Sequence, residues 1–305
     1  MDLTQWLDRQ RIRTEDLRPL LKYTLDCGDA IIERGSRLQI MECVKDAYGK
    51  PYIPGSSLKG MFRTILLGED IIKNTEKYQR EKSEMSREAM DSHDRRNYYL
   101  KNNMAGIENK AYRVLNRTER KPTDAVNDLM QGFIVSDSEP LSTDDLVLCQ
   151  KIDRHTDGTE KRLPLLRECV KPNTEIRFTI TIDTNTCRLS DKQLMDAVKV
   201  FMTSYYRNFS KAFKGMEVPK TNYVLCGGGC GFVSKTIIYP MYDKLEGIEM
   251  AQKVFEHTVS DKMKSQHKHY LDKKYGASPH TIKCTRYRGK LVQMGVCRIE
   301  KIESI

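Results

Sequence analysis

The sequence predicts an α+β fold in which helices pack against a β-sheet. Between residues 174 and 183 apolar side chains alternate with polar ones, the pattern of a strand with one buried face. Between 191 and 213 the apolar residues recur every three or four positions instead, which predicts a helix. Because strands and helices follow one another along one chain, we expect helices against an antiparallel sheet. Further strands are expected at 38–44, 132–135, 146–152, 223–226 and 293–302.

The charge of the chain favours an anionic partner. Fifty-two basic and 42 acidic residues give a formal charge of +10, for which nucleic acid is the first candidate and an anionic membrane the second. From His257 to the C-terminus basic residues exceed acidic ones by seven. Tyr270, Tyr275 and Tyr287 are interleaved there and could stack on bases. A solvated basic face remains the alternative.

The nine cysteines form no disulfide or metal framework that the sequence reveals. There is no C-x-x-C pair, no signal peptide, and no apolar run near the ~20 residues of a membrane span. We therefore expect free thiols in a reducing cytoplasm. Cys226 and Cys230, or His267 and His269, could begin a metal site, but no third ligand is evident. The sequence predicts neither a metal nor another cofactor.

The stretch from Pro51 to Arg63 predicts a short extended segment, a turn and a helix. Ser56 and Ser57 are expected to cap a helix that starts at Leu58. Lys59 and Arg63 are four residues apart, so both could reach a phosphate from one helix face. An ordinary capped turn with two surface cations explains the stretch equally well.

A second motif is the glycine cluster, in which four of five residues lack a side chain, so that the backbone can approach a ligand closely. Its glycines are Gly227, Gly228, Gly229 and Gly231. A helix is expected directly after it, with Ser234 and Lys235 supplying side-chain contacts. A P-loop is excluded because Ser234 precedes the lysine, and the dinucleotide pattern fails at Phe232. A plain turn remains open.

The string from Pro51 to Arg63 resembles the signature of the RAMP superfamily, the RNA-binding proteins of CRISPR systems. Three further stretches, at 135–140, 163–168 and 227–236, resemble the fifth-subunit family of type III-A CRISPR (Csm) complexes. The resemblance covers residues 38–68 and 130–302. It implies a modified ferredoxin-like (RRM-like) RAMP fold with a helical insertion. No strand is evident before Leu38, so the usual N-terminal strand is expected to be missing.

We expect residues 1–305 to form a single RAMP domain with three parts. Residues 1–68 carry the signature motif, and residues 126–305 form a sheet and helix part with the glycine-rich loop. Between them, 69–125 is rich in charged and polar residues. It is expected to be a helical, partly mobile insertion, and a solvated linker explains it better than a binding arm.

The resemblance implies a non-catalytic RNA-binding subunit. Such a subunit binds the 3′ part of the CRISPR RNA (crRNA), caps the filament of backbone subunits and supports maturation of the crRNA 3′ end. The implied partners are crRNA, target RNA, the backbone RAMP subunit and host nucleases, in a prokaryotic cytoplasm and away from membranes. The residues expected to bind RNA are Ser56, Ser57, Lys59, Arg63, Gly227, Gly228, Gly229, Gly231, Ser234 and Lys235.

Two other functions remain open, an endoribonuclease and a cap that contacts protein more than RNA. The resemblance places a catalytic aspartate of the backbone subunit shortly before the Tyr-Ile-Pro-Gly segment, where this chain has only Glu42. Asp26 and Asp29 lie further away, and no histidine has a recognisable catalytic context. We therefore expect no catalytic residue. The sequence does not decide whether Arg167 and Glu168 contact RNA or only support the fold.

Overall fold

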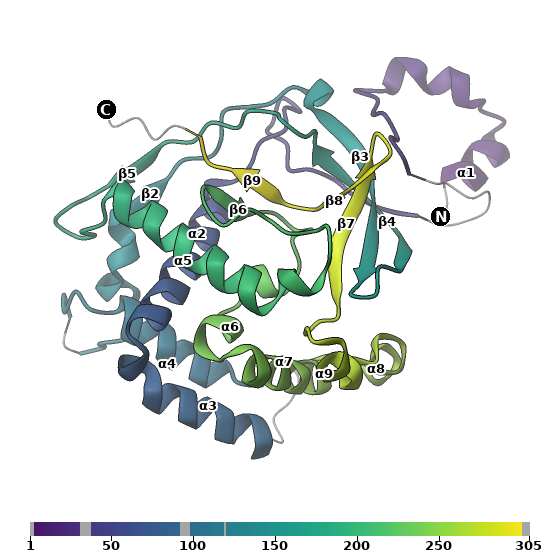
Figure 1. The fold of residues 1–305 in the computed structure, drawn as a ribbon. Coiled ribbons are helices and arrows are strands. Elements are labelled where there is room, and N and C mark those ends of the chain that lie inside the picture. The colour runs from purple at the N-terminus through teal and green to yellow at the C-terminus, as the bar shows by residue number, and fades with distance from the viewer. Residues whose placement is uncertain (1–2, 31–37, 92–97, 119, 301–305) are drawn as a thin grey trace.

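The computed structural model describes residues 3–30, 38–91, 98–118 and 120–300. This part of the chain combines a five-stranded sheet, two two-stranded sheets and a layer of helices (Figure 1). Its strands are β1 Gln39–Met41, β2 Phe133–Val135, β3 Leu146–His155, β4 Glu160–Val170, β5 Ile180–Ile182, β6 Tyr223–Leu225, β7 Thr281–Tyr287, β8 Lys290–Gln293 and β9 Val296–Arg298. The α+β class is thereby confirmed.

The helices include several short 3-10 turns, labelled η. The α-helices are α1 Leu3–Gln10, α2 Gly55–Lys73, α3 Gln79–Asp91, α4 Lys101–Tyr112, α5 Asp191–Asn208, α6 Ile238–Met241, α7 Lys244–Thr258, α8 Asp261–His267 and α9 Asp272–Tyr275. The 3-10 turns are η1 Thr14–Leu20, η2 Thr75–Tyr78, η3 Ala125–Asn127, η4 Leu129–Gly132, η5 Thr143–Asp145, η6 Ser210–Ala212, η7 Val233–Lys235 and η8 His269–Leu271. Among the described helices, none is both long and apolar enough to cross a bilayer.

The main sheet has the order β1-β4-β3-β7-β8 and is mixed. β4, β3, β7 and β8 pair antiparallel, whereas β1 runs parallel to β4. The expectation of a wholly antiparallel sheet is therefore wrong at this edge. The sequence reading also missed β4 and β7, because their polar residues interrupt the apolar alternation that marks a strand.

The stretch at 174–183 is a shorter strand than the sequence predicts. Its alternation of exposed and partly buried side chains is present, but only β5, Ile180–Ile182, pairs regularly, because its partner β2 has three residues. Before β5 the chain still meets the segment after β2, since the Ser136 amide donates to the Thr179 carbonyl (2.9 Å). Ordinary ladder pairing ends there because the Ser136 hydroxyl accepts the Thr179 amide proton.

The final strand predicted at 293–302 is divided in the structure. β8 ends at Gln293, and β9 starts at Val296 after a turn at Gly295, whose φ is +80°. β9 pairs with β6 rather than with the main sheet. Residues 301 and 302 lie outside the described residues.

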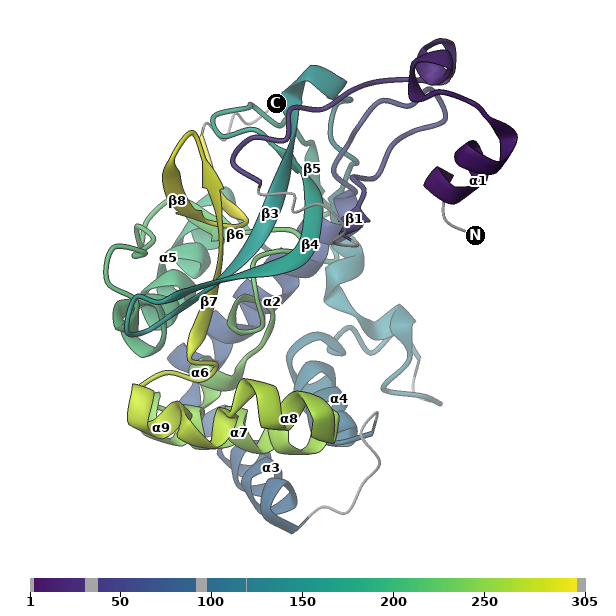
Figure 2. The same cartoon turned by 90° about the vertical axis from the view of Figure 1, so that its right-hand side faces the viewer.

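The helices form a layer on one side of the sheet, and the core lies between the two (Figure 2). α5 presents a fully apolar face with Val198, Phe201 and Met202, as its spacing predicts. It starts with a capping box, in which Ser190 and Gln193 satisfy each other's backbone amides. α2 crosses α5 closely because Gly68 leaves no side chain between itself and the ring of Phe201.

The segment 69–125 is helical, as predicted, but its helices are packed rather than solvated. Tyr78, Met85, Ile107 and Tyr112 are buried and belong to the same core as α5. An ion pair between Lys110 and Glu81 joins α4 to α3 at 2.7 Å. The apolar residues of this segment are few, but helical spacing gathers them on one face. The described part of this segment is therefore packed onto the core and is not a solvated linker.

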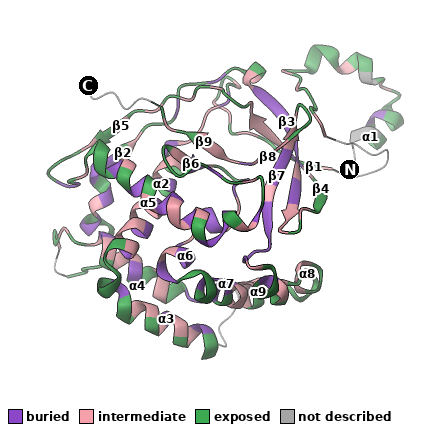
Figure 3. Ribbon diagram, viewed as in Figure 1, coloured by how far each residue is buried: buried purple, intermediate pink, exposed green. Residues whose placement is uncertain are grey.

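The N-terminal helices lie at a corner of the molecule, far from α3 and α7 (Figures 1 and 2). Most of the described α1 side chains are exposed (Figure 3), and Leu7 is the buried one among them. Residues 3–30 form helices and loops without a strand, and 31–37 lie outside the described residues. The loss of a first strand thus stays a prediction.

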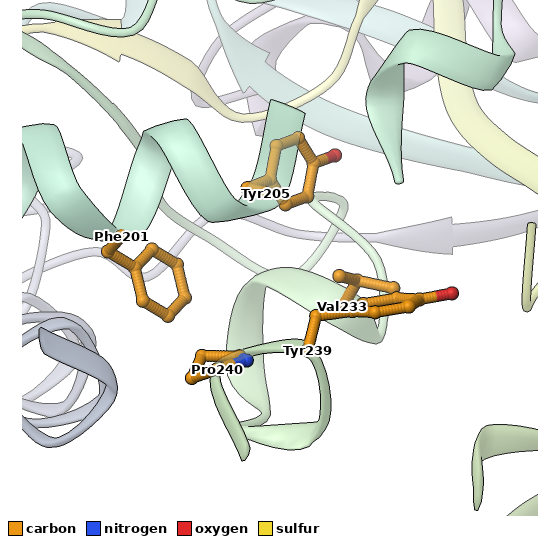
Figure 4. Close-up of a pocket in the computed structure, with 5 residues that line it drawn as sticks. All are labelled: Phe201, Tyr205, Val233, Tyr239 and Pro240. Atoms are coloured by element: carbon orange, nitrogen blue, oxygen red, sulfur yellow. The ribbon is translucent and has the colours of Figure 1, made fainter. Parts of the chain in front are cut away.

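The space between α5 and α6 is filled by side chains, not by a ligand cavity. Figure 4 shows the side chains of Phe201, Tyr205, Val233, Tyr239 and Pro240 around it. They leave no room for a water molecule. The core between α5 and α6 is therefore closely packed.

Gly55 is the residue on which the seating of α2 depends. A Cβ atom there would lie 2.3 Å from the Ser136 carbonyl oxygen, so backbone would have to move. We expect Gly55→Ala to lower the free energy of unfolding by about 1–3 kcal/mol, as overpacking does. Gly60→Ala is the matched control: nothing lies within 4 Å of its Cβ position, and alanine should stabilise the helix by about 1 kcal/mol. Equal effects of the two changes in urea unfolding would contradict this account.

Candidate nucleic-acid interface

The helix of the signature string begins earlier than the sequence suggests. α2 starts at Gly55, not Leu58, and neither Ser56 nor Ser57 caps it. The Asp137 carboxylate instead accepts the Gly55 amide proton at 2.7 Å. The hydrogen-bond acceptor at the start of α2 therefore comes from a stretch about 80 residues further along the chain. Ser56 and Ser57 lie exposed in the first turn of the helix.

Two of the recognised stretches, 51–63 and 135–140, bind each other. The Ser138 hydroxyl accepts the Ile53 amide proton at 2.9 Å, and the Ser138 amide donates to the Ile53 carbonyl at 3.0 Å. A further backbone bond joins Leu141 to Pro51 at 2.7 Å. The presence of Ile53 and Ser138 in these two motifs is therefore explained by their contacts within the fold, without a role in binding RNA.

Arg63 and Lys59 have different surroundings. The Arg63 guanidinium pairs with Asp128 at 3.0 Å and Glu108 at 3.2 Å, and it stacks on the ring of Tyr112. The Lys59 side chain forms no ion pair with any residue that the structure describes. Arg63 is thus already neutralised by Asp128 and by Glu108 of the insertion, while Lys59 is available to an anion.

The glycine cluster is a loop between β6 and η7. Gly227 and Gly231 have φ values of +97° and +90°, which side chains rarely adopt. The expected helix after the loop is wrong: only the 3-10 turn η7 and the four-residue α6 follow, too short to present a helix N-terminus. Ser234 is buried, and its hydroxyl bonds the Gly231 carbonyl at 3.1 Å, whereas Lys235 is exposed.

Arg167 of β4 lies directly under this loop. A Cβ atom placed on Gly228 would be 2.9 Å from Arg167 Nη1, so the bare backbone of Gly228 lies against the end of this guanidinium. Arg167 Nε is buried without a hydrogen-bond partner. No carboxylate among the described residues pairs with this guanidinium. Two motifs 60 residues apart in the chain thus meet around a cation that no described carboxylate pairs with.

Lys151 and Lys283 complete a group that we call the cationic cluster, Lys151, Arg167 and Lys283. Lys151 sits at a β-bulge of β3, where the register with β4 shifts. The Lys283 stem lies 3.6 Å from the Cβ position of Gly231, and its ammonium pairs with Asp153 at 2.7 Å. Burial, and then the positive charges of Lys283 and Arg167, lower the pKa of Lys151. A bound anion would relieve this mutual repulsion.

The sequence analysis missed Lys151, whereas Lys283 belongs to the basic C-terminal stretch that it favoured for phosphate contact. It did not place either lysine beside Arg167, because strand pairing brings them together only in the folded chain. Among the described residues, no hydrogen bond or ion pair joins this cluster to Lys59 or the exposed serines of α2.

Glu168 points to the opposite side of β4 and anchors the N-terminal segment. Its carboxylate accepts hydrogen bonds from Tyr23 Oη at 2.6 Å, the Cys43 amide at 2.9 Å and Lys45 Nζ at 2.5 Å. Burial raises the pKa of Glu168, but these bonds, led by that from Lys45, outweigh it and hold the pKa below its ordinary value. Glu168 therefore serves the fold.

The acidic residues weighed for catalysis are spread out. Asp26 accepts the amide of its own turn at Gly28, and Asp29 accepts the Gly289 amide at 2.8 Å. Glu42 is exposed beside β1.

The cysteine pair at the glycine cluster is a poor metal site. Burial raises the pKa of Cys226, which disfavours the thiolate that a metal would need.

Comparison with known proteins defines the class first. The RAMP superfamily pattern matches residues 27–194, more than half of the chain, and the chain belongs to this superfamily. Within it, the chain is homologous to Csm5 of type III-A CRISPR systems. The resemblance found in the motifs is thereby confirmed.

Three curated relatives carry the name "CRISPR system Cms protein Csm5". The protein of Mycobacterium tuberculosis H37Rv is 31% identical over 271 residues, covering 86% of this chain and 66% of the relative. That of Streptococcus thermophilus is 30% identical over 67% of this chain and 51% of its own length. That of Enterococcus italicus is 28% identical over 83% and 64%. The chain thus spans between 51% and 66% of these relatives' length.

A solved structure shares the fold. It is a chain of a cryo-EM structure of a Csm–crRNA–target RNA ternary complex in a type III-A CRISPR-Cas system. The TM-score is 0.55 at 18% identity, and the match covers 98% of this chain and 87% of the other. The mixed sheet and its helices are therefore consistent with a RAMP fold.

The different surroundings of Arg63 and Lys59 can be tested by stability. We expect Arg63→Gln to lower the thermal midpoint by a few degrees, because Asp128 and Glu108 lose their partner inside a partly buried network. Lys59→Gln, the matched control on the same helix, should leave the midpoint within a degree or so. An equal loss in both variants would contradict the assignment of Arg63 to the fold.

The anchoring role of Glu168 predicts a pH dependence. Because its pKa is lowered in the folded state, its contribution to stability is present at neutral pH and is lost as the pH falls below about 4.3 and through the lowered value. Glu168→Gln should therefore be less stable than the wild type at pH 7, and the difference should shrink on acidification. Urea unfolding at several pH values measures this, with the exposed Glu139→Gln as control. A difference that stays constant with pH would refute it.

Proposed function

We propose that this chain is an RNA-binding subunit of a type III-A Csm complex that holds the 3′ part of the crRNA without cutting it. In this role it caps the filament of backbone subunits and supports maturation of the crRNA 3′ end. The homology with Csm5 supports membership of a Csm complex. The geometry of the glycine loop supports the position of the RNA site.

The observation that carries the RNA site is Arg167 under Gly228. A partly buried guanidinium that no carboxylate of the described residues pairs with, beside Lys151 and the Asp153-paired Lys283, is a site where a phosphate gains charge-assisted hydrogen bonds. The bare backbone of Gly227 and Gly228 is exposed above it, so a sugar–phosphate chain can approach closely. Lys235 and, separately, Ser56, Ser57 and Lys59 extend the proposed contacts.

Such contacts position RNA without reading its sequence. Phosphate contacts dominate affinity and are independent of the bases. A subunit that must accept any guide needs this kind of binding. Arg63 and the Ser234 hydroxyl are engaged within the protein, and we assign them to support of the site.

The exposed edge of β1 is the surface that we assign to neighbouring subunits. Ile40 and Met41 are 53% and 39% exposed on this edge strand, and Val44 is 48% exposed just beyond it. An open strand with apolar side chains is a liability unless a partner covers it. The cations beneath the glycine loop nevertheless favour an RNA-holding subunit over a cap that touches protein alone.

The RNA site can be tested by titrating the purified chain into labelled single-stranded RNA at two salt concentrations, with and without Mg²⁺. We expect Arg167→Gln to weaken binding about tenfold and to reduce the salt dependence by about one phosphate contact. Arg80→Gln is the matched control, with the same charge change on a 79% exposed side chain of α3. The RNA should remain intact.

Each outcome distinguishes the functions. Equal binding by the wild type and Arg167→Gln would remove the glycine loop from the site. Metal-dependent cleavage that survives repurification would establish a ribonuclease instead. Absence of salt-sensitive binding in a folded wild-type chain would favour the protein-contacting cap.

A further inference from the structure

A compact group of metal-binding side chains lies outside the proposed RNA site. It consists of His269 in η8, Asp272 at the start of α9, and His280 just before β7. One potential ligand atom from each lies within 4.8 Å of the others. Asp272 is fully buried, and its Oδ2 atom accepts the Ser278 hydroxyl proton at 2.5 Å. The sequence offered only the pair His267 and His269, because Asp272 and His280 are brought to His269 by folding.

We propose that His269, Asp272 and His280 form a binding site for a transition-metal cation of the Zn²⁺ class. Two imidazole nitrogens and one carboxylate are the donor types that Zn²⁺ takes in three-ligand sites, which leave the fourth position to water. Zn²⁺ bonds of about 2.0–2.1 Å in a tetrahedron place ligand atoms about 3.3 Å apart.

One ligand atom from each side chain lies within reach of a common ion, and the hydrogen bond between His280 and Asp272 would have to lengthen to admit it. His269 Nδ1 lies 3.1 Å from Asp272 Oδ2, and His280 Nδ1 meets Asp272 Oδ1 in a still shorter contact. The carboxylate thus presents one oxygen to each imidazole. Small rotations of the two rings would turn both nitrogens toward one ion, with Ser278 orienting the carboxylate from behind.

Two more imidazoles flank the group. The ring of His155, at the end of β3, lies 5.2 Å from that of His280, and the ring of His267 stacks on that of His269 at 5.6 Å. Either ring can supply a fourth ligand in place of water. The His269 side chain is 13% exposed, so an ion has a path from solvent, while Asp272 and His280 lie behind it.

An ion held there would join two layers of the fold. His269 and Asp272 belong to the helical layer, whereas His280 leads directly into β7, which carries Lys283 three residues later. The ion would close the loop from 269 to 280 and fix the end of the sheet against the helices (Figure 2). Binding to the folded chain alone would therefore stabilise it.

The test is titration of the untagged, chelator-treated full chain with Zn²⁺, followed by thermal unfolding and calorimetry, and with Co²⁺, whose visible absorption reports tetrahedral coordination. We expect one ion per chain and a rise of several degrees in the thermal midpoint. His269→Gln should weaken binding at least tenfold and abolish the cobalt absorption. The side-chain amide of the introduced glutamine can still donate a hydrogen bond to Asp272. His269→Gln therefore keeps this hydrogen bond, which Asp272→Asn would disturb.

His257→Gln is the matched control, because His257 stacks on Tyr99 away from the group. It should bind like the wild type. A folded wild type without a Zn²⁺-dependent shift would overturn the proposal. Equal binding by the wild type and His269→Gln would also overturn it, since the ion would then bind elsewhere, for example at cysteines.

Discussion

The pairing of β3 with both β4 and β7 is the constraint on which the rest of the structure depends. β3 and β4 form a hairpin, and the pairing of β3 with β7 joins strands that are more than a hundred residues apart in the chain. Arg167 lies opposite Cys149 in the β3–β4 ladder, Lys283 lies opposite Asp153 in the β3–β7 ladder, and Lys151 lies at the register shift between them. Burial, and then the nearby charges of Lys283 and Arg167, lower the pKa of Lys151, while Asp153 opposes them.

Arg167 and Glu168 show how one strand serves two purposes. Successive residues of a strand point to opposite faces, so one side chain meets the glycine loop and the other meets the N-terminal segment. The Glu168 carboxylate accepts hydrogen bonds from three donors, whereas no described carboxylate forms an ion pair with Arg167. The charge of Glu168 is thus satisfied within the described fold, as in a structural residue. The charge of Arg167 is not, which is consistent with the RNA contact that we propose for it.

The glycine loop gains its shape from both sides. Below it lie Arg167 and the stem of Lys283, and behind it the turn at Met294 and Gly295 packs against Gly229 and Cys230. A Cβ atom at Gly295 would lie 2.5 Å from the Cys226 carbonyl oxygen. The loop is therefore packed closely against its neighbours on both sides.

The sequence by itself determined the superfamily, the α+β class and the long helix α5, because local apolar spacing and the motif order carry that information. It also located the glycine loop and Lys59. Only the tertiary structure decided that Asp137 rather than Ser56 or Ser57 caps α2, that Arg63 is neutralised, and that Ser234 is buried. It alone gathered the cationic cluster and the group around Asp272. The reason is physical: these contacts join residues far apart in the chain, and no local pattern records which strand or helix will lie opposite.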